Sequence, residues 1–238
     1  MILKYLFLRM RRDYLGHILL TLFPILLVTM FSFIYQDTGQ DMSGLKAFLT
    51  IGFVLMFQYF AATYTTEYVH KDIATPMKDR LLASPTNTSS FPLQTTFMAS
   101  LIVYLQSLVV LLYANYILGA EIEHFWTLLP VFYLAVLLAQ LIAGLIVLLS
   151  RSLSLGSGAM IGMGVLFPFL AQFNTELPDN AVLNFFRDYG TPMSLSFQAI
   201  DGIRYGHGDD VFVALLIQAI LIIVLFIAMR LLTRKVIR

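Results

Sequence analysis

The chain has 238 residues, of which 59% are hydrophobic and only 12% are charged, and this composition excludes an ordinary water-soluble domain. It contains no cysteine, which excludes disulfides, thiolate metal sites and cysteine nucleophiles. A formal net charge of +1 gives no electrostatic reason to expect a nucleic-acid partner.

Residues 1–14 combine apolar and basic side chains. Leu6 and Met10 stand among Arg9, Arg11 and Arg12, a pattern that predicts an amphipathic helix lying on the inner membrane surface. The alternative is a frayed cytoplasmic tail.

Six runs of about twenty apolar residues follow, each long enough for an α-helix to cross about 30 Å of hydrocarbon. They cover residues 17–35, 47–69, 93–118, 126–149, 155–173 and 211–232. Of the 15 basic residues, only Lys46, Arg187 and Arg204 lie on the side of the membrane opposite the termini, so the positive-inside rule predicts cytoplasmic termini. An even number of spans also requires both termini on one side. We therefore expect an all-α, multi-pass protein of the cell membrane, with residues 1–238 forming a single transmembrane domain.

The gap between the second and third spans, residues 70–92, contains its own helix signal. Thr75 is a good N-cap, Pro76 suits the first helical position and Pro85 prevents the helix from continuing. This predicts a short cytoplasmic helix over residues 76–84. A helix of this length is marginal alone in water, so we expect it to dock against the headgroup layer or another protein.

The fifth span carries small residues at every fourth position. Ser154, Gly158 and Gly162 share one helix face, which lets another helix approach closely. We predict that this face packs against another helix.

The gap before the last span, residues 174–210, is rich in large apolar residues for an extracellular loop. Pro178 and Asp179 indicate the start of one helix that Gly190 ends, and Thr191 and Pro192 indicate the start of another. These signals predict two short amphipathic helices that re-enter the outer leaflet or cap the bundle.

No charged residue lies near the middle of any span, which disfavours a proton-coupled carrier. The polar residues of the spans are neutral amides. They line a cavity for an amphipathic substrate or form hydrogen bonds between helices, and the sequence leaves both roles open. These amides are Gln58, Gln106, Asn115, Gln140 and Gln218.

The order of these elements resembles the permease subunit of ATP-binding-cassette exporters of the type-2 permease family, over nearly the whole chain. Glu67 followed by ATPMKDRLLASP at residues 74–85 is similar to that family's acidic residue and its Gly-Thr, Leu-Leu, Pro pattern, with Ala74 in the usual place of glycine. LPDNAVLNFFRDYGTPMSLSFQAIDGIRYG at residues 177–206 is similar to its Leu-Pro and Pro-Met/Thr elements.

The resemblance implies a coupling helix that presses on a separate ATPase subunit. The residues it assigns to coupling are Thr75, Pro76, Met77, Lys78, Asp79, Arg80, Leu81, Leu82 and Glu67. No G-x-x-x-x-G-K-[ST] motif occurs, so we expect this chain to bind no cofactor itself and ATP with Mg²⁺ to bind the partner. The resemblance further implies two ATPase subunits, a second permease chain, identical or paralogous, and export, and it admits drugs, peptide antibiotics, lipid-linked glycans and ions as cargo. The apolar interior with its scattered amides favours a hydrophobic or amphipathic cargo such as a drug, a peptide antibiotic or a lipid-like molecule.

Two other classes of protein share some of these features. A channel or secondary carrier without ATP predicts internal repeats, and none is visible between the two halves of the chain. An intramembrane aspartyl protease is suggested by the string G-H-G-D at residues 206–209. That chemistry needs two facing carboxylates inside the bilayer, and Asp209 precedes the last span on the outer side. We therefore expect no catalytic residue and no metal site.

Overall fold

The computed structural model describes residues 2–36, 43–74, 90–172 and 181–237. Within these ranges the secondary structure is helical and contains no strand. The helices are α1 (Ile2–Arg11), α2 (Tyr14–Gln36), α3 (Ser43–Ala74), α5 (Phe91–Tyr116), α6 (Phe125–Ser150), α7 (Leu153–Gln172), α8 (Ala181–Tyr189), α9 (Pro192–Tyr205) and α10 (Gly208–Ile237).

The predicted spans are confirmed, because 6 of the described helices are long and apolar enough to cross a membrane: α2, α3, α5, α6, α7 and α10. In hydrocarbon every backbone N–H and C=O must find its partner within the protein, and a continuous α-helix meets this need inside a single segment. The chain is therefore an all-helical polytopic membrane protein.

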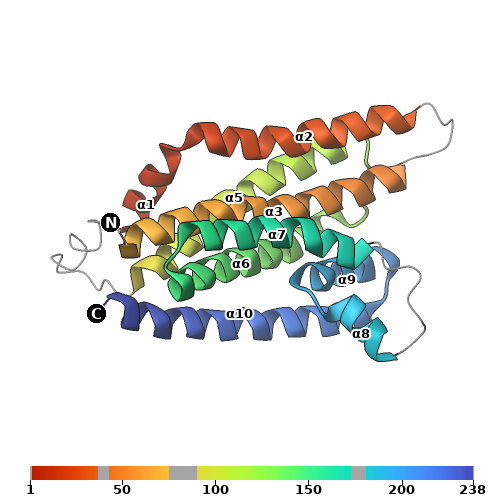
Figure 1. The fold of residues 1–238 in the computed structure, drawn as a ribbon. Helices are drawn as coiled ribbons and strands as arrows, with labels where there is room; N and C mark the ends of the chain where they lie inside the picture. The colour runs from red at the N-terminus through yellow and green to blue at the C-terminus, as the bar shows by residue number, and fades with distance from the viewer. Residues whose placement is uncertain (1, 37–42, 75–89, 173–180, 238) are drawn as a thin grey trace.

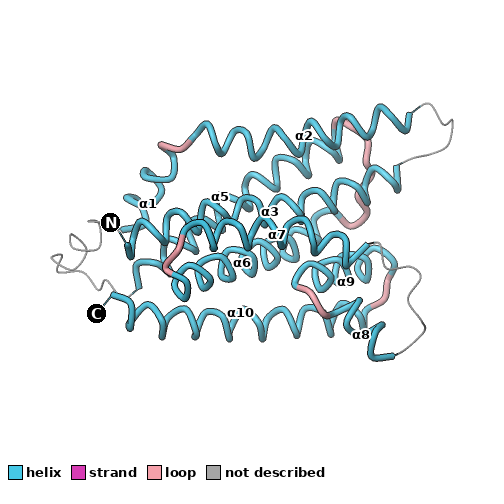
Figure 2. The backbone as a smooth tube through the Cα atoms, in the orientation of Figure 1, coloured by secondary structure: helices cyan, strands magenta, loops and turns pink. Residues whose placement is uncertain are grey.

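Helices α3 and α6 form the centre of the bundle (Figures 1 and 2). Most of their side chains are buried, and α3 packs against α5, α6 and α7. Helices α2, α7 and α10 lie outside and expose large apolar residues such as Leu19, Phe169 and Phe212. Apolar surface of this extent is typical of a lipid-facing protein.

Both termini lie at the same end of the bundle, and we call it the terminal end (Figure 1). Helix α1 also lies there, where it packs against α5. Helices α8 and α9 lie at the opposite end, where α9 packs against α6, α7 and α10. The common position of the termini is what an even number of spans requires.

The two short helices predicted before the last span are present as α8 and α9. Thr191 and Ser194 form a capping box, in which Thr191 Oγ1 accepts from the Ser194 N–H at 2.9 Å and Ser194 Oγ accepts from the Thr191 N–H at 3.0 Å. Pro192 occupies the first helical position. Re-entry of this pair into the bilayer stays a prediction, and Pro178 and Asp179 lie outside the described residues.

The predicted loop over residues 70–92 is shorter than expected at both ends. Helix α3 continues through His70 to Ala74, and α5 begins at Phe91. The extension is anchored because Asp72 and Ile73 are buried against the bundle. The predicted helix over residues 76–84 lies outside the described residues.

Candidate functional site

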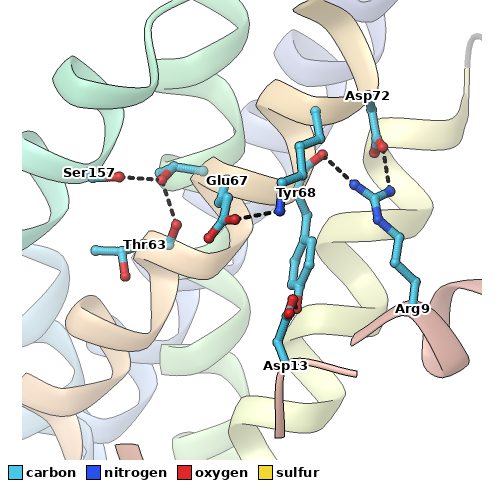
Figure 3. Close-up of polar contacts among 9 residues, drawn as sticks. Arg9, Asp13, Thr63, Glu67, Tyr68, Asp72 and Ser157 are labelled. Carbon is cyan, nitrogen blue, oxygen red and sulfur yellow. Dashed lines mark hydrogen bonds and ion pairs between the residues drawn. The ribbon is translucent and has the colours of Figure 1, made fainter. Parts of the chain in front are cut away.

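A buried ion pair joins the N-terminal helix to the last turn of α3 (Figure 3). Arg9 Nη1 lies 2.5 Å from Asp72 Oδ1, and Arg9 Nη2 donates to the Tyr68 carbonyl at 3.3 Å. The second carboxylate oxygen of Asp72 accepts from Thr95 Oγ1 of α5 at 2.8 Å. Asp72 is fully buried, and a buried carboxylate is tolerated only when its oxygens are paired in this way. Three helices therefore meet at one carboxyl group.

A second contact fastens the linker between α1 and α2 to the same part of α3. Tyr68 Oη donates to Asp13 Oδ2 at 2.5 Å, and the Arg9 guanidinium carbon lies 5.2 Å from the centre of the Tyr68 ring. Cation–π contacts of this kind add to the hydrogen bonds when they are shielded from water. We call Arg9, Asp13, Tyr68 and Asp72 the anchor cluster. It holds α1 and the end of α3 together.

The predicted coupling residue Glu67 directly precedes Tyr68 of the anchor cluster in α3. Its Oε1 is 2.5 Å from Lys71 Nζ, an i,i+4 pair on the surface of α3. Pairs of this type contribute little to stability. Glu67 therefore pairs with a basic residue near the end of α3, and its role in transmission stays a prediction.

The other residues assigned to coupling lie outside the described residues. They are Thr75, Pro76, Met77, Lys78, Asp79, Arg80, Leu81 and Leu82, which follow directly after the last residue of α3. The anchor cluster is thus the last described structure before this segment. Sequence reasoning missed the cluster because Arg9 and Asp72 are 63 positions apart, and local spacing does not pair residues at that separation.

A groove of about 780 Å³ lies between α2, α3 and α7, and we call it the α2–α3–α7 groove. Phe23, Phe57 and Phe60 line it, and Thr63 and Glu67 line it closer to the terminal end. Its size falls within the range of about 300–1,000 Å³ that is typical of small-molecule sites. A mostly apolar groove with a polar end suits a molecule that has an apolar body and a polar group.

Helix α7 approaches α3 through glycines, but they are not the predicted ones. A Cβ at Gly156 would meet Val147 and Thr66 side-chain atoms at 2.5 and 3.2 Å, and one at Gly164 would meet Phe60 at 2.7 Å. Thr66 Oγ1 also lies 2.8 Å from Ser157 Oγ.

The predicted packing face of Ser154, Gly158 and Gly162 is exposed. A Cβ at Gly158 or Gly162 would have no neighbour within 4 Å. Among the described residues this face packs against no helix of the chain, because α7 turns Gly156 and Gly164 toward α3 instead. A contact of the exposed face with another chain stays a prediction.

Two of the predicted amides are buried between α3 and α6. Gln140 Oε1 accepts from Thr65 Oγ1 at 2.5 Å, and Gln140 Nε2 donates to the Gln58 carbonyl at 3.5 Å. The Gln58 side chain is buried, and its amide has no hydrogen-bond partner among the described residues. Neither residue lines the α2–α3–α7 groove. The Gln140 contacts are those of helix packing, one of the two roles that the sequence left open.

The remaining amides also contact neighbouring segments and do not line the α2–α3–α7 groove. Gln218 Nε2 donates to a serine hydroxyl of α9 at 3.3 Å, and Asn115 Oδ1 accepts from the Ile122 N–H at 2.8 Å. Gln106 Nε2 donates to the His17 carbonyl at 2.9 Å, and Gln106 lines a separate pocket between α1, α2 and α5. A role of the amides in a substrate cavity stays a prediction.

The end opposite the termini carries several charged residues but no paired buried carboxylates among those described. Burial raises the pKa of Asp201 above its ordinary value, although the neighbouring Arg204 opposes the shift. Asp209 is exposed at the start of α10. An intramembrane aspartyl protease needs two facing carboxylates that are shielded from water, and the exposed Asp209 does not meet that need.

A family model described as ABC-2 type transporter matches residues 1–206 of this chain. The match includes α1, the anchor cluster, the α2–α3–α7 groove and the α8–α9 pair. No curated protein and no solved structure matches the chain.

Proposed function

This chain belongs to the ABC-2 type transporter family, and from that premise we propose that it exports a hydrophobic or amphipathic molecule, driven by ATP hydrolysed on a separate subunit. Family membership makes it the membrane-spanning subunit of a transporter that works with ATPase subunits. Direction and cargo are our proposals, with drugs, peptide antibiotics and lipid-like molecules as the candidate cargo classes.

The α2–α3–α7 groove is the observation that carries the proposal on cargo. Its walls present aromatic rings from α2 and α3, and Thr63 and Glu67 line it nearer the terminal end. A molecule with an apolar body and a polar group would satisfy both regions. A small inorganic ion would leave the apolar walls without a partner.

The anchor cluster supports the proposed coupling route. Residues 75–89 connect the end of α3 to α5, and Asp72 joins the end of α3 to Arg9 and Thr95. A push on this connection by a closing ATPase would move α1 and α3 together and change the shape of the groove. Such a two-state element, biased by a nucleotide bound elsewhere, is how motors drive conformational change.

The proposed assembly has two permease chains, identical or paralogous, and two ATPase chains that bind ATP and Mg²⁺. The exposed α7 face of Gly158 and Gly162 is a candidate contact between the permease chains. We place the complex in the cell membrane with both termini in the cytoplasm. The concentration of basic residues at the terminal end supports that orientation.

The first test is recovery of the ATPase. A tagged chain should co-purify with a Walker-motif protein encoded beside it, and Leu81→Asp and Arg80→Ala should reduce that recovery. Arg234→Ala is the matched control, because Arg234 is an exposed arginine at the terminal end of α10. Unchanged recovery in both coupling variants would overturn the coupling assignment.

The second test concerns cargo and direction. Growth of a deletion strain against membrane-active compounds identifies a substrate, and inside-out vesicles should then accumulate it only with ATP. Phe23→Ala in the groove should raise the concentration that half-saturates transport, whereas Phe226→Ala on the exposed face of α10 should not. Accumulation without ATP would favour a channel or secondary carrier, and equal effects of both variants would remove the groove from the cargo path.

A further inference from the structure

A second pocket, of about 500 Å³, lies on the other side of α2, between α1, α2 and α5. We call it the α1–α2–α5 pocket. The groove proposed for cargo is lined by Gly16 and Leu19 of α2, whereas this pocket is lined by Ile18 and Leu22. The two therefore use different faces of one helix. A lipid could occupy the α1–α2–α5 pocket in any bilayer that holds the chain, whatever the cargo of the groove.

The lining of the α1–α2–α5 pocket is almost wholly apolar, and its one charged residue, Arg11, lies at one end. Arg11 and Tyr14 line it at the terminal end, His17 and Gln106 line its middle, and Leu22 and other apolar residues line the part deeper along α2. Residues 14 to 22 rise about 12 Å along α2. That distance is most of the roughly 15 Å that half of a bilayer core measures.

Arg11 supplies an unpaired cation at the terminal end of the pocket. It is exposed and makes no ion pair within the described part of the chain, whereas Arg9 of the same helix is bound to Asp72. Arginine near an anionic membrane surface attracts the headgroups of acidic lipids. A free cation above an apolar pocket complements a ligand that has an anionic head and an apolar tail.

His17 and Gln106 line the middle of the pocket. His17 Nδ1 lies 3.2 Å from Gln106 Nε2, and the same amide nitrogen donates to the His17 carbonyl at 2.9 Å. The ring is held in place by stacking on Tyr64, with ring centres 5.2 Å apart. His17 Nε2 is covered by surrounding protein atoms, so this part of the pocket presents apolar ring surface to a ligand.

From this order of groups we propose that the α1–α2–α5 pocket binds an anionic phospholipid of the leaflet at the terminal end. Arg11 faces the phosphate, and the apolar lining of the pocket holds one acyl chain. The bilayer itself is the source of this ligand, because the pocket borders residues that face lipid, such as Leu105 and Val109. The lipid would sit against α1, whose position the anchor cluster ties to α3.

The experiment uses tryptophan quenching, since the chain contains one tryptophan. In a Trp126→Phe background, Tyr14→Trp places the reporter in the pocket and Leu15→Trp places it on an adjacent, exposed position outside the pocket. The full chain, with its ATPase where the complex requires it, is reconstituted into phosphatidylcholine containing a small share of brominated lipid. The brominated lipid is either phosphatidylglycerol or phosphatidylcholine.

We expect the Tyr14→Trp reporter to select brominated phosphatidylglycerol over brominated phosphatidylcholine by about fivefold, the preference that one basic residue near an anionic surface supplies. The Leu15→Trp reporter should show no such selection. Arg11→Gln should abolish the selection at the pocket, and Arg12→Gln, which removes the same charge from the neighbouring exposed residue, should preserve it.

Three results would overturn the proposal. Equal quenching by the two brominated lipids at the Tyr14→Trp reporter would show that the pocket has no preference for an anionic head. Equal losses in Arg11→Gln and Arg12→Gln would assign the preference to the basic surface as a whole. Displacement of the quencher by the transported compound, but not by unbrominated phosphatidylglycerol, would assign the pocket to cargo.

Discussion

Arg9 and Asp72 are 63 positions apart in the sequence and meet at 2.5 Å (Figure 3). The contact joins the first helix of the chain to the last turn of α3, directly before the segment assigned to coupling. Asp72 is completely buried, and only a small part of the Arg9 side chain is exposed. Removal of the arginine would leave a buried carboxylate with Thr95 as its remaining side-chain partner.

The first prediction concerns this pair. Arg9→Gln should lower the free energy of unfolding by about 3–5 kcal/mol, the cost of leaving a buried charge without its partner. Thermal unfolding in detergent measures the loss, and ATP-driven transport should fall with it. Arg12→Gln is the matched control, since Arg12 is exposed. Equal stability of the two variants would contradict the account of the anchor cluster.

The second prediction concerns a close contact between α2 and α3 at Gly16. A Cβ at Gly16 would lie 1.6 Å from Tyr64 Oη and 2.6 Å from Tyr64 Cζ, so the stacked ring must move. Gly16→Ala should therefore lower the free energy of unfolding by about 1–3 kcal/mol, as overpacking does. Gly158→Ala, where no atom lies within 4 Å, should have a much smaller effect.

A double variant tests whether the clash with Tyr64 causes the loss of stability in Gly16→Ala. Gly16→Ala combined with Tyr64→Ala should be no less stable than Tyr64→Ala alone, because the clashing ring is absent. Additive losses in the double variant would mean that Gly16 matters for another reason.

The third prediction separates packing from transport at Gln140. Gln140→Leu removes the hydrogen bond to Thr65 and should cost about 1 kcal/mol of stability, as interhelical hydrogen bonds in membranes do. The substrate concentration that half-saturates transport should stay unchanged, in contrast to Phe23→Ala. A variant of normal stability with altered substrate preference would instead give Gln140 a place in the cargo path.

The fourth prediction concerns the exposed glycines of α7. If they contact a second permease chain, Gly162→Leu should weaken self-association measured by crosslinking or single-molecule photobleaching in bilayers, while the folded chain keeps its stability. Gly44→Leu in α3 is the matched control, because Gly44 also has no neighbour within 4 Å. Unchanged self-association in Gly162→Leu would exclude this face from the contact.

Features encoded over short stretches of sequence were predicted well. The spans follow from runs of apolar residues, and the start of α9 follows from Thr191 and Pro192, which act on the backbone of their own helix. The sequence indicated Gly158 as a packing residue, whereas the glycine of α7 that packs inside the chain is Gly156, and a contact of Gly158 with another chain stays a prediction. Both glycines lie on α7, and only the rotation of that helix relative to α3 decides which one faces inward.

The sequence by itself determined that the chain is helical and crosses the membrane several times, because hydrophobic length and capping are local properties. Its transporter family follows from the match of residues 1–206 to the family model. The tertiary structure decided which polar residues meet: Arg9 with Asp72, Tyr68 with Asp13, and Gln140 with Thr65. Side chains of the spans face either lipid or one another, and helical periodicity alone does not separate the lipid-facing side chains from the buried ones. The packing of α1, α3 and α6 separates them, because a polar group that is buried without a partner is costly.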